Sequence, residues 1–211
     1  MINIAVLGTG AVGSALGARL GKVGHPIFYG LRSLDEPVPQ ELLEQSGPAA
    51  RAGSCQQAIA ASQAVLLAVP WDQVRGILDA ADNLSEKILI DCINPLKADL
   101  TDLEFGYSTS AAEQLASWYP EAHVVKAFNV LSAAAMADPH FGDDRASLFY
   151  CGDDSASKKL VAELASQLEF DPVDCGPLRA ARWLEPMAML YVHLAVFEGW
   201  GGDCALKMMK R

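Results

Sequence analysis

Short apolar runs alternate with longer stretches in which apolar residues recur every three or four positions, along almost the whole chain. Short runs bounded by turn residues predict buried strands, whereas the longer periodic stretches predict helices. Strands are predicted at 2–7, 26–30, about 50–53, 64–69, 87–91, 123–127, 147–151 and 170–174. Helices are predicted near 11–23, 40–46, 55–62, 71–81, 109–117, 155–168 and 179–198. This alternation favours an α/β fold, a doubly wound and mostly parallel sheet with helices on both faces.

The first strand leads directly into a glycine-rich turn with G-x-G-x-x-G spacing, and a helix of small residues follows. In that context the spacing is a dinucleotide-binding fingerprint. Gly8 permits a tight turn, Gly10 lets the backbone approach a pyrophosphate, and Gly13 lets the helix pack closely on the strand. Free N–H groups at the helix start then face the phosphates. The residues assigned to cofactor binding here are Gly8, Thr9, Gly10, Ala11, Val12 and Gly13.

The strands before residue 130 nearly complete a nucleotide-binding sheet of the Rossmann type. After residue 130 come a strand–helix–strand unit and an apolar terminal helix. We therefore predict two parts, a dinucleotide-binding Rossmann domain over 1–130 and a small C-terminal α/β lobe over 131–211 packed on it.

The end of the second strand indicates which dinucleotide is bound. NAD-specific sites usually carry an acidic residue there to accept the ribose hydroxyls, but this chain has Leu31, Arg32 and Ser33. A guanidinium fork and a hydroxyl suit a 2′-phosphate, so we predict NADP. Arg32 in a solvated loop is the alternative, and Asp35 and Glu36 would repel a phosphate if they turned inward.

Three further strand ends are predicted to complete the cofactor cleft, because ligands bind beyond the carboxyl ends of parallel strands. Ala68, Val69 and Pro70 would pass under the nicotinamide ribose, and Trp71 is either packing or a ligand contact. The other polar strand ends supply three further cofactor-binding residues, Asn94, Ala127 and Asn129. Asn129 either orients a ring amide or substrate or simply forms a turn.

Charge and cysteine content limit the partners. The net charge of −10 over 211 residues argues against nucleic acid or an anionic membrane as partner. No apolar run reaches the roughly 18 residues of a membrane span, and a strand beginning at residue 2 leaves no room for a secretory signal. The five cysteines form no C-x-x-C pair, and an odd number cannot all pair internally, so we expect a reducing cytoplasm and no metal.

The sequence offers no strong pair of catalytic acid and base. Arg182 and Glu185 stand three positions apart on a predicted helix, where a local ion pair is expected. His193 lies in an apolar helix and is interpreted as a satisfied structural histidine. Hydride transfer between two ring cofactors needs no protein acid, so this elimination favours ring-to-ring chemistry, and the catalytic residue is left unassigned apart from Asn129.

The chain resembles the NADPH-dependent coenzyme F420 reductases over nearly its whole length. The resemblance is carried by the glycine turn and by the segments 69–71, 124–129, 151–154, 174–178, 181–185 and 197–201. The cytosolic domain of the STEAP-type metalloreductases is similar over the same segments. The resemblance implies NADP over the glycine turn and a deazaflavin or flavin ring in a cleft between the lobes. The substrate residues that it implies are Leu131, Ala133, Gly199 and Gly201.

Three functions remain open at this point. The first is an NADP-linked oxidoreductase that exchanges hydride with F420, FMN or FAD. The second is a non-catalytic NADP(H)-sensing protein, and the third is a short imine or keto-acid reductase. The electron acceptor stays open because Asn129 stands where archaeal deazaflavin reductases place a histidine. The apolar stretch 187–197 is either a homodimer interface or the buried face of the lobe.

Overall fold

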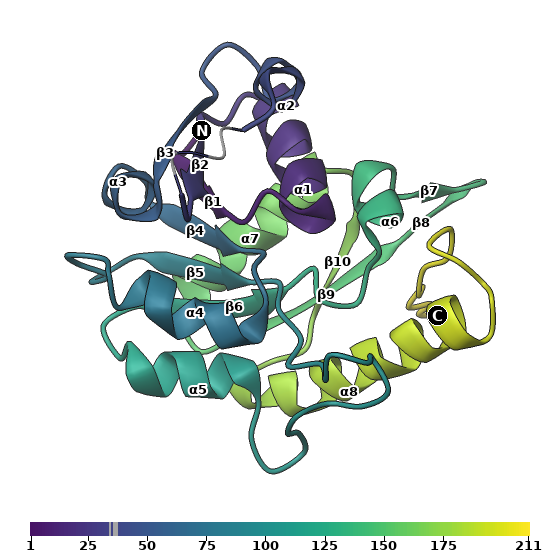
Figure 1. The fold of residues 1–211 in the computed structure, drawn as a ribbon. Coiled ribbons are helices and arrows are strands. Elements are labelled where there is room, and N and C mark those ends of the chain that lie inside the picture. The colour runs from purple at the N-terminus through teal and green to yellow at the C-terminus, as the bar shows by residue number, and fades with distance from the viewer. Residues whose placement is uncertain (34, 36–37) are drawn as a thin grey trace.

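A single eight-stranded sheet forms the centre of the molecule in the computed structural model, which describes residues 1–33, 35 and 38–211. The sheet has the order β10-β9-β6-β5-β4-β1-β2-β3 (Figure 1). Its strands are β1 (Ile4–Leu7), β2 (Ile27–Leu31), β3 (Arg51–Ser54), β4 (Ala64–Leu67), β5 (Ile88–Asp91), β6 (His123–Ala127), β9 (Ser147–Gly152) and β10 (Asp171–Asp174). All eight predicted strands are therefore present, and the doubly wound α/β fold is confirmed.

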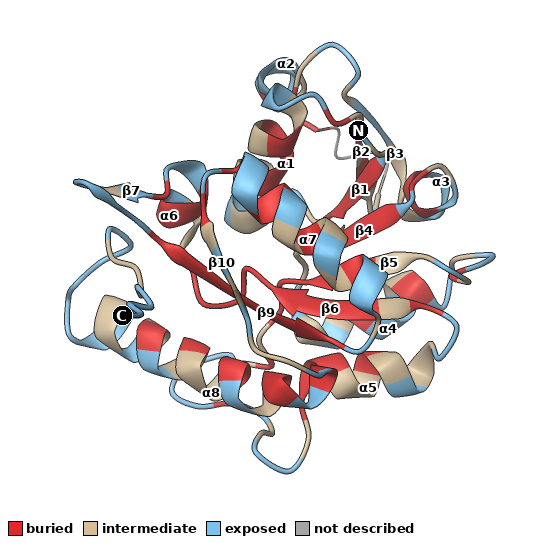
Figure 2. Cartoon of the chain, turned by 180° about the vertical axis from the view of Figure 1, so that it is seen from behind, coloured by how far each residue is buried: buried red, intermediate tan, exposed pale blue. Residues whose placement is uncertain are grey.

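Helices cover both faces of the sheet, because successive side chains of each strand point to opposite sides. In β1, Ile4 and Val6 pack into one core, and Ala5 and Leu7 pack into the other. Figure 2 shows that β1 itself is buried between the two layers of helices. The first core is closed by α1 (Ala11–Lys22), α2 (Gln40–Gln45), α6 (Ala133–Ala137) and α7 (Ser155–Gln167). The second is closed by α3 (Cys55–Ala60), α4 (Trp71–Leu78), α5 (Ala111–Trp118) and α8 (Ala181–Val192).

One pair of neighbouring strands runs in opposite directions. β9 pairs with β6 antiparallel, whereas every other pair in the large sheet is parallel. The carboxyl ends of β1, β2, β4, β5 and β6 therefore share one edge with the amino ends of β9 and β10. The strands before and after residue 130 form one continuous sheet, and the division into two parts at that residue stays a prediction.

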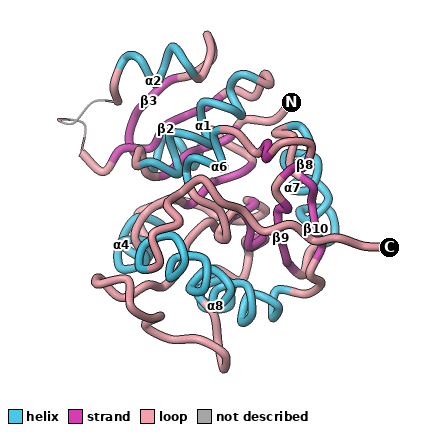
Figure 3. The backbone as a smooth tube through the Cα atoms, turned by 90° about the vertical axis from the view of Figure 1, so that its right-hand side faces the viewer, coloured by secondary structure: helices cyan, strands magenta, loops and turns pink. Residues whose placement is uncertain are grey.

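The C-terminal tail returns to this same edge. Ser147, the first residue of β9, donates its backbone N–H to Leu206 O (3.0 Å) and accepts at Oγ from Met208 N (2.9 Å). Lys207 pairs with Asp171 at the start of β10. The tail thus passes beside β9 and β10 (Figure 3).

Several elements differ from the predictions. The sequence analysis did not predict the five-residue α6 or the hairpin of β7 (His140–Phe141) and β8 (Asp144–Arg145). The single helix expected over 179–198 is three segments: a 3₁₀ turn at Leu178–Ala180, α8, and a π-helical turn at His193–Phe197. Among the described residues no helix is long and apolar enough to cross a membrane.

Candidate dinucleotide-binding site

The glycine turn joins β1 to α1, and two of its glycines are required by the backbone. Gly8 has φ +101°, and a Cβ there would lie 2.3 Å from Ala68 O. A Cβ on Gly13 would lie 1.9 Å from Gly8 O, so only glycine lets α1 approach the turn this closely. A Cβ on Gly10 would meet nothing within 4 Å. The turn therefore has the predicted geometry, with open space over Gly10.

The start of α1 is open toward that space. Gly10, the N-cap residue, has no side chain that could cap the helix, and the first turn carries no acidic residue. The first intrahelical bond runs from Ser14 N to Gly10 O (2.9 Å). The preceding N–H groups of Ala11, Val12 and Gly13 have no partner within the helix. Such groups, together with the helix dipole, attract an anion.

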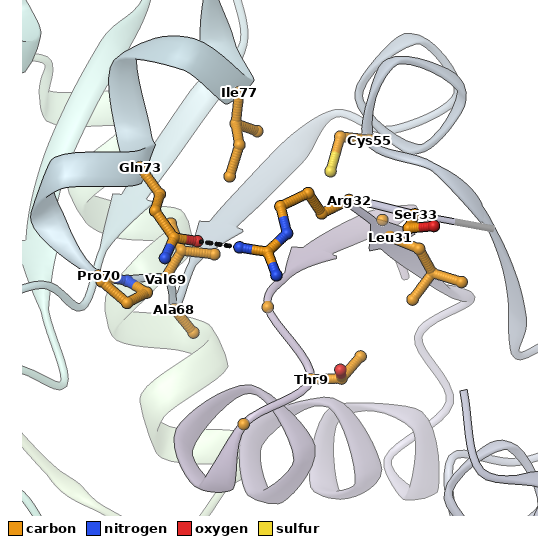
Figure 4. Close-up of a pocket in the computed structure, with 13 residues that line it drawn as sticks. Thr9, Leu31, Arg32, Ser33, Cys55, Ala68, Val69, Pro70, Gln73 and Ile77 are labelled. Atoms are coloured by element: carbon orange, nitrogen blue, oxygen red, sulfur yellow. Dashed lines mark hydrogen bonds between the residues drawn. The ribbon is translucent and has the colours of Figure 1, made fainter. Parts of the chain in front are cut away.

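A cavity of about 320 Å³ lies over the turn, between β1, β2 and the start of α4 (Figure 4). Nine of the predicted cofactor residues line it: Gly8, Thr9, Gly10, Leu31, Arg32, Ser33, Ala68, Val69 and Pro70. Six others lie outside its lining: Ala11, Val12, Gly13, Asn94, Ala127 and Asn129. The structure thus brings together residues from the ends of three strands, whereas the ends of β5 and β6 do not reach this cavity.

Four lining residues were missed by the sequence analysis: Gly30, Cys55, Gln73 and Ile77. Cys55 begins α3, and Gln73 and Ile77 stand one turn apart on α4. Burial raises the pKa of the Cys55 thiol, which keeps it neutral at physiological pH. The four-residue spacing of Gln73 and Ile77 marks a shared helix face, but the sequence alone does not show which face meets β2.

The polar lining of the cavity is cationic or neutral. Arg32 Nη1 donates to Gln73 Oε1 at 3.4 Å, across the cavity. No carboxylate is among the described residues of the lining. Asp35 instead turns back on Ser33, whose Oγ accepts from Asp35 N at 3.2 Å and donates to Asp35 Oδ2 at 3.4 Å. Glu36, the other acidic residue considered, lies outside the described residues.

Asn94 and Asn129 are bonded to each other. Asn94 Nδ2 donates to Asn129 O (2.8 Å), and Asn129 Nδ2 donates to Asn94 Oδ1 and Leu184 O (both 3.0 Å). These two acceptors fix the orientation of the Asn129 amide. Asn129 Oδ1 is buried and accepts from no described residue. A role for Asn129 in orienting a ring amide stays a prediction.

A buried ionic cluster lies beneath this asparagine pair. Lys126 Nζ contacts Asp91 Oδ2 (2.7 Å) and Glu185 Oε1 (2.8 Å), and all three side chains are 0% exposed. The same ammonium donates to Ile93 O at 2.5 Å. Burial raises the pKa of Glu185, although the charge of Lys126 opposes that shift. The cluster joins β5, β6 and α8 at one point.

Glu185 does not form the local ion pair that its spacing predicted. Its carboxylate accepts from the N–H groups of Ala111 (3.0 Å) and Ala112 (3.3 Å), at the start of α5. Arg182 instead donates from Nε and Nη2 to Glu113, with contacts of 2.8–3.1 Å. The expected Arg182–Glu185 pair was wrong because tertiary partners outcompete a weak surface pairing on one helix.

Trp71 and His193 were also interpreted from sequence. Trp71 stacks on Trp118 at 5.2 Å between ring centroids and meets Phe105 edge-on at 5.5 Å, so its packing role is confirmed. The side chain of His193 is 53% exposed, with Nε2 3.4 Å from Glu198 Oε1. His193, interpreted as a satisfied structural histidine, thus has a partner in Glu198, but it lies in the π-helical turn and faces solvent instead of the core.

The segments assigned to substrate lie side by side, although outside the cavity. Ser132 Oγ donates to Gly202 O at 2.6 Å, which holds the turn after α8 against the segment that leads into α6. In that turn Gly199 and Gly201 adopt φ +73° and +71°, a backbone that favours glycine. The four predicted substrate residues on these two segments are Leu131, Ala133, Gly199 and Gly201.

Comparison with known proteins agrees with this geometry. Residues 3–95 match the family described as NADP oxidoreductase, coenzyme F420-dependent. The crystal structure of a candidate F420-dependent NADP reductase from Arthrobacter sp. FB24 is 31% identical, with a TM-score of 0.89 and all of both chains covered. The F420-dependent NADP reductase of Methanocaldococcus jannaschii is 29% identical over 209 residues, covering 92% of this chain and 93% of that protein.

Mammalian metalloreductases match as well. Rat metalloreductase STEAP3 is 31% identical over 188 residues, which cover 89% of this chain and 36% of that protein. The chain thus spans just over a third of the metalloreductase. Full coverage of the Arthrobacter structure at 31% identity shows the family: the chain belongs to the coenzyme F420-dependent NADP oxidoreductases.

Proposed function

We propose that the protein exchanges a hydride between NADP(H), held in the cavity over the glycine turn, and a deazaflavin such as coenzyme F420 or a flavin. The observation that carries the cofactor half is the cavity itself. It combines a guanidinium, two hydroxyls and an open helix start with a lining whose described residues include no carboxylate.

The residues fit a phosphorylated dinucleotide. Gly10 leaves room for a pyrophosphate, and the N–H groups of Ala11 to Gly13 supply donors to it. Arg32 and Ser33, at the end of β2, would hold the 2′-phosphate by charge-assisted hydrogen bonds. When bound, the nicotinamide supplies the hydride chemistry, and the task of the protein is to hold two rings in contact.

The cofactor assignment is tested by the dissociation constants of NADPH and NADH for Arg32→Ala. We expect the variant to lose at least tenfold in NADPH affinity and little in NADH affinity, since charge-assisted hydrogen bonds contribute about 1.5–3 kcal/mol. Arg51→Ala is the matched control. Arg51 lies on the neighbouring β3, stacks over Phe28 at 4.2 Å, and does not line the cavity. The assignment would be contradicted if the wild type bound NADPH and NADH with similar dissociation constants, or if Arg32→Ala weakened the binding of both cofactors equally.

For the second ring we propose the region where the turn after α8 meets the start of α6. The contact of Ser132 with Gly202 supports this site. An NADPH oxidation assay with F420, FMN, FAD and a ferric chelate identifies the acceptor. Ala133→Leu should raise the KM for the acceptor severalfold and leave that for NADPH unchanged. Ala137→Leu, at the exposed end of α6, is the control, and equal effects of both variants would argue against this location.

Two further expectations belong to the same proposal. Trp183, Leu190 and Phe197, seven positions apart, are 61%, 55% and 49% exposed, and a second copy of the chain would cover them in a homodimer. Light scattering of the wild type and of Leu190→Glu tests this, and a monomeric wild type would refute it.

The five cysteines are all free, which supports a cytoplasmic location because disulfides are rare there.

A further inference from the structure

The Arg32–Gln73 contact joins opposite walls of the cavity. Arg32 follows β2, whereas Gln73 lies in the first turn of α4, and their side chains meet across the space above Thr9 (Figure 4). The distance from Nη1 to Oε1 is 3.4 Å, longer than the usual 2.7–3.2 Å of an N–H···O bond. Gln73 is therefore in contact with the Arg32 guanidinium without binding it tightly.

The placement of Gln73 follows from the packing of α4. Val74 and Leu78 are buried in the core beneath the helix, so their position fixes how the helix is rotated. Gln73 and Ile77 then share the face that lines the cavity. Pro70 ends the loop before α4, and its carbonyl accepts from Gln73 N at 3.1 Å. The amide of Gln73 thus extends from the hydrogen-bonded first turn of α4.

The chemistry of the amide matters at this position. Its oxygen can hold a guanidinium without cancelling the positive charge, and its nitrogen keeps two donors for an anion. A carboxylate of the same shape would neutralise Arg32 and repel a phosphate, because like charges in one partly buried site repel strongly.

We infer that Gln73 is a specificity-determining residue, which aims Arg32 at the 2′-phosphate and keeps that wall of the cavity free of negative charge. This inference rests on the proposed binding of NADP at Arg32. Gln73 would act through Arg32 and through the charge of the cavity wall. It would therefore affect binding of the 2′-phosphate, which only NADPH carries, and not binding of the groups that NADPH and NADH share.

The experiment measures dissociation constants for NADPH and NADH by fluorescence titration, in wild type and in Gln73→Glu, Gln73→Leu, Arg32→Ala and Arg32→Ala/Gln73→Leu. We expect Gln73→Glu to lower the NADPH-to-NADH affinity ratio at least tenfold. Gln73→Leu should lower it severalfold, and should lower it no further once Arg32 is absent. Gln114→Glu, on the half-buried part of α5 and outside the cavity lining, controls for the added charge.

The outcomes separate the two claims. If Arg32→Ala lowers the ratio and Gln73→Glu does not, the inference about Gln73 is overturned while NADP binding stands. If Gln73→Glu weakens NADPH and NADH equally, Gln73 contacts the shared adenosine and the inference is again overturned. If Arg32→Ala leaves the ratio unchanged, the proposed function fails first. Thermal unfolding of each variant confirms that a lost affinity does not reflect a lost fold.

Discussion

Replacing Lys126 with methionine would remove the only cation of the described ionic cluster while keeping a side chain of similar length. Asp91 and Glu185 would remain as two carboxylates, both fully buried, and Ile93 O would lose its donor. The partly compensating N–H groups of Ala111 and Ala112 would stay with Glu185. The variant therefore leaves uncompensated negative charge where water cannot reach it.

The expected loss of stability is about 3–5 kcal/mol, the cost of removing one partner from a buried ion pair. For a protein of this size that corresponds to a fall in Tm of roughly 10 °C. Burial already raises the pKa of Glu185 in the wild type, against the charge of Lys126, and without that charge it should rise further. An acid with a raised folded pKa binds more protons folded than unfolded, so stability falls as pH rises between the unfolded and folded pKa values. The deficit of the variant should accordingly be larger at pH 8 than at pH 5.

Urea unfolding followed by circular dichroism at pH 5 and pH 8 measures both effects. Lys159→Met is the matched control, because Lys159 is exposed and its Nζ lies 3.9 Å from Glu163 Oε1. Such surface pairs contribute little, so we expect a change under about 0.5 kcal/mol. A Lys126→Met loss as small as that of the control, or a loss that grows toward pH 5, would refute the reasoning about the buried cluster.

Three other variants test separate features of the fold. Gly13→Ala places a Cβ against Gly8 O, so it should abolish NADPH binding in a titration even where circular dichroism shows a folded protein. Ser110→Ala removes the side chain that accepts from Glu113 N at the start of α5, and should cost about 1 kcal/mol in urea unfolding. The pKa of Asp154 is lowered by its bonds to the next helical turn, so its cap on α7 should be lost as pH falls below the ordinary value of 3.8. Asp154→Asn should reduce the dependence of the free energy of unfolding on pH below that value. An unchanged dependence would contradict the assignment of Asp154 as the titrating cap.

The sequence was sufficient for features set by local spacing. The glycine turn and the strand end at Arg32 were predicted because each lies within a few residues of the element that places it. Gln73 was missed because its role depends on how α4 is rotated against a strand about 40 residues earlier. The short α6 was missed because four alanines and one methionine carry no periodic signal.

The buried cluster shows the same limit more clearly. Lys126 lies in an apolar strand run, and Glu185 was matched to its neighbour Arg182 on the same helix. Their true partners come from other elements, and no rule of local spacing relates positions 91, 126 and 185. Such long-range charge pairing depends on which strands lie next to each other in the sheet. The sequence analysis predicted the strands but not their order, and it did not predict that β9 runs antiparallel to β6.

The reversal of direction between β6 and β9 divides the residues at this sheet edge into two sets that are separate in the sequence. Every residue that lines the cavity lies before residue 78, whereas α6, the turn after α8 and the tail reach the same sheet edge from the other side of the reversal. If the second ring binds where we propose, the segments after β6 could be exchanged to accept a different electron carrier while the residues that line the cavity stay unchanged.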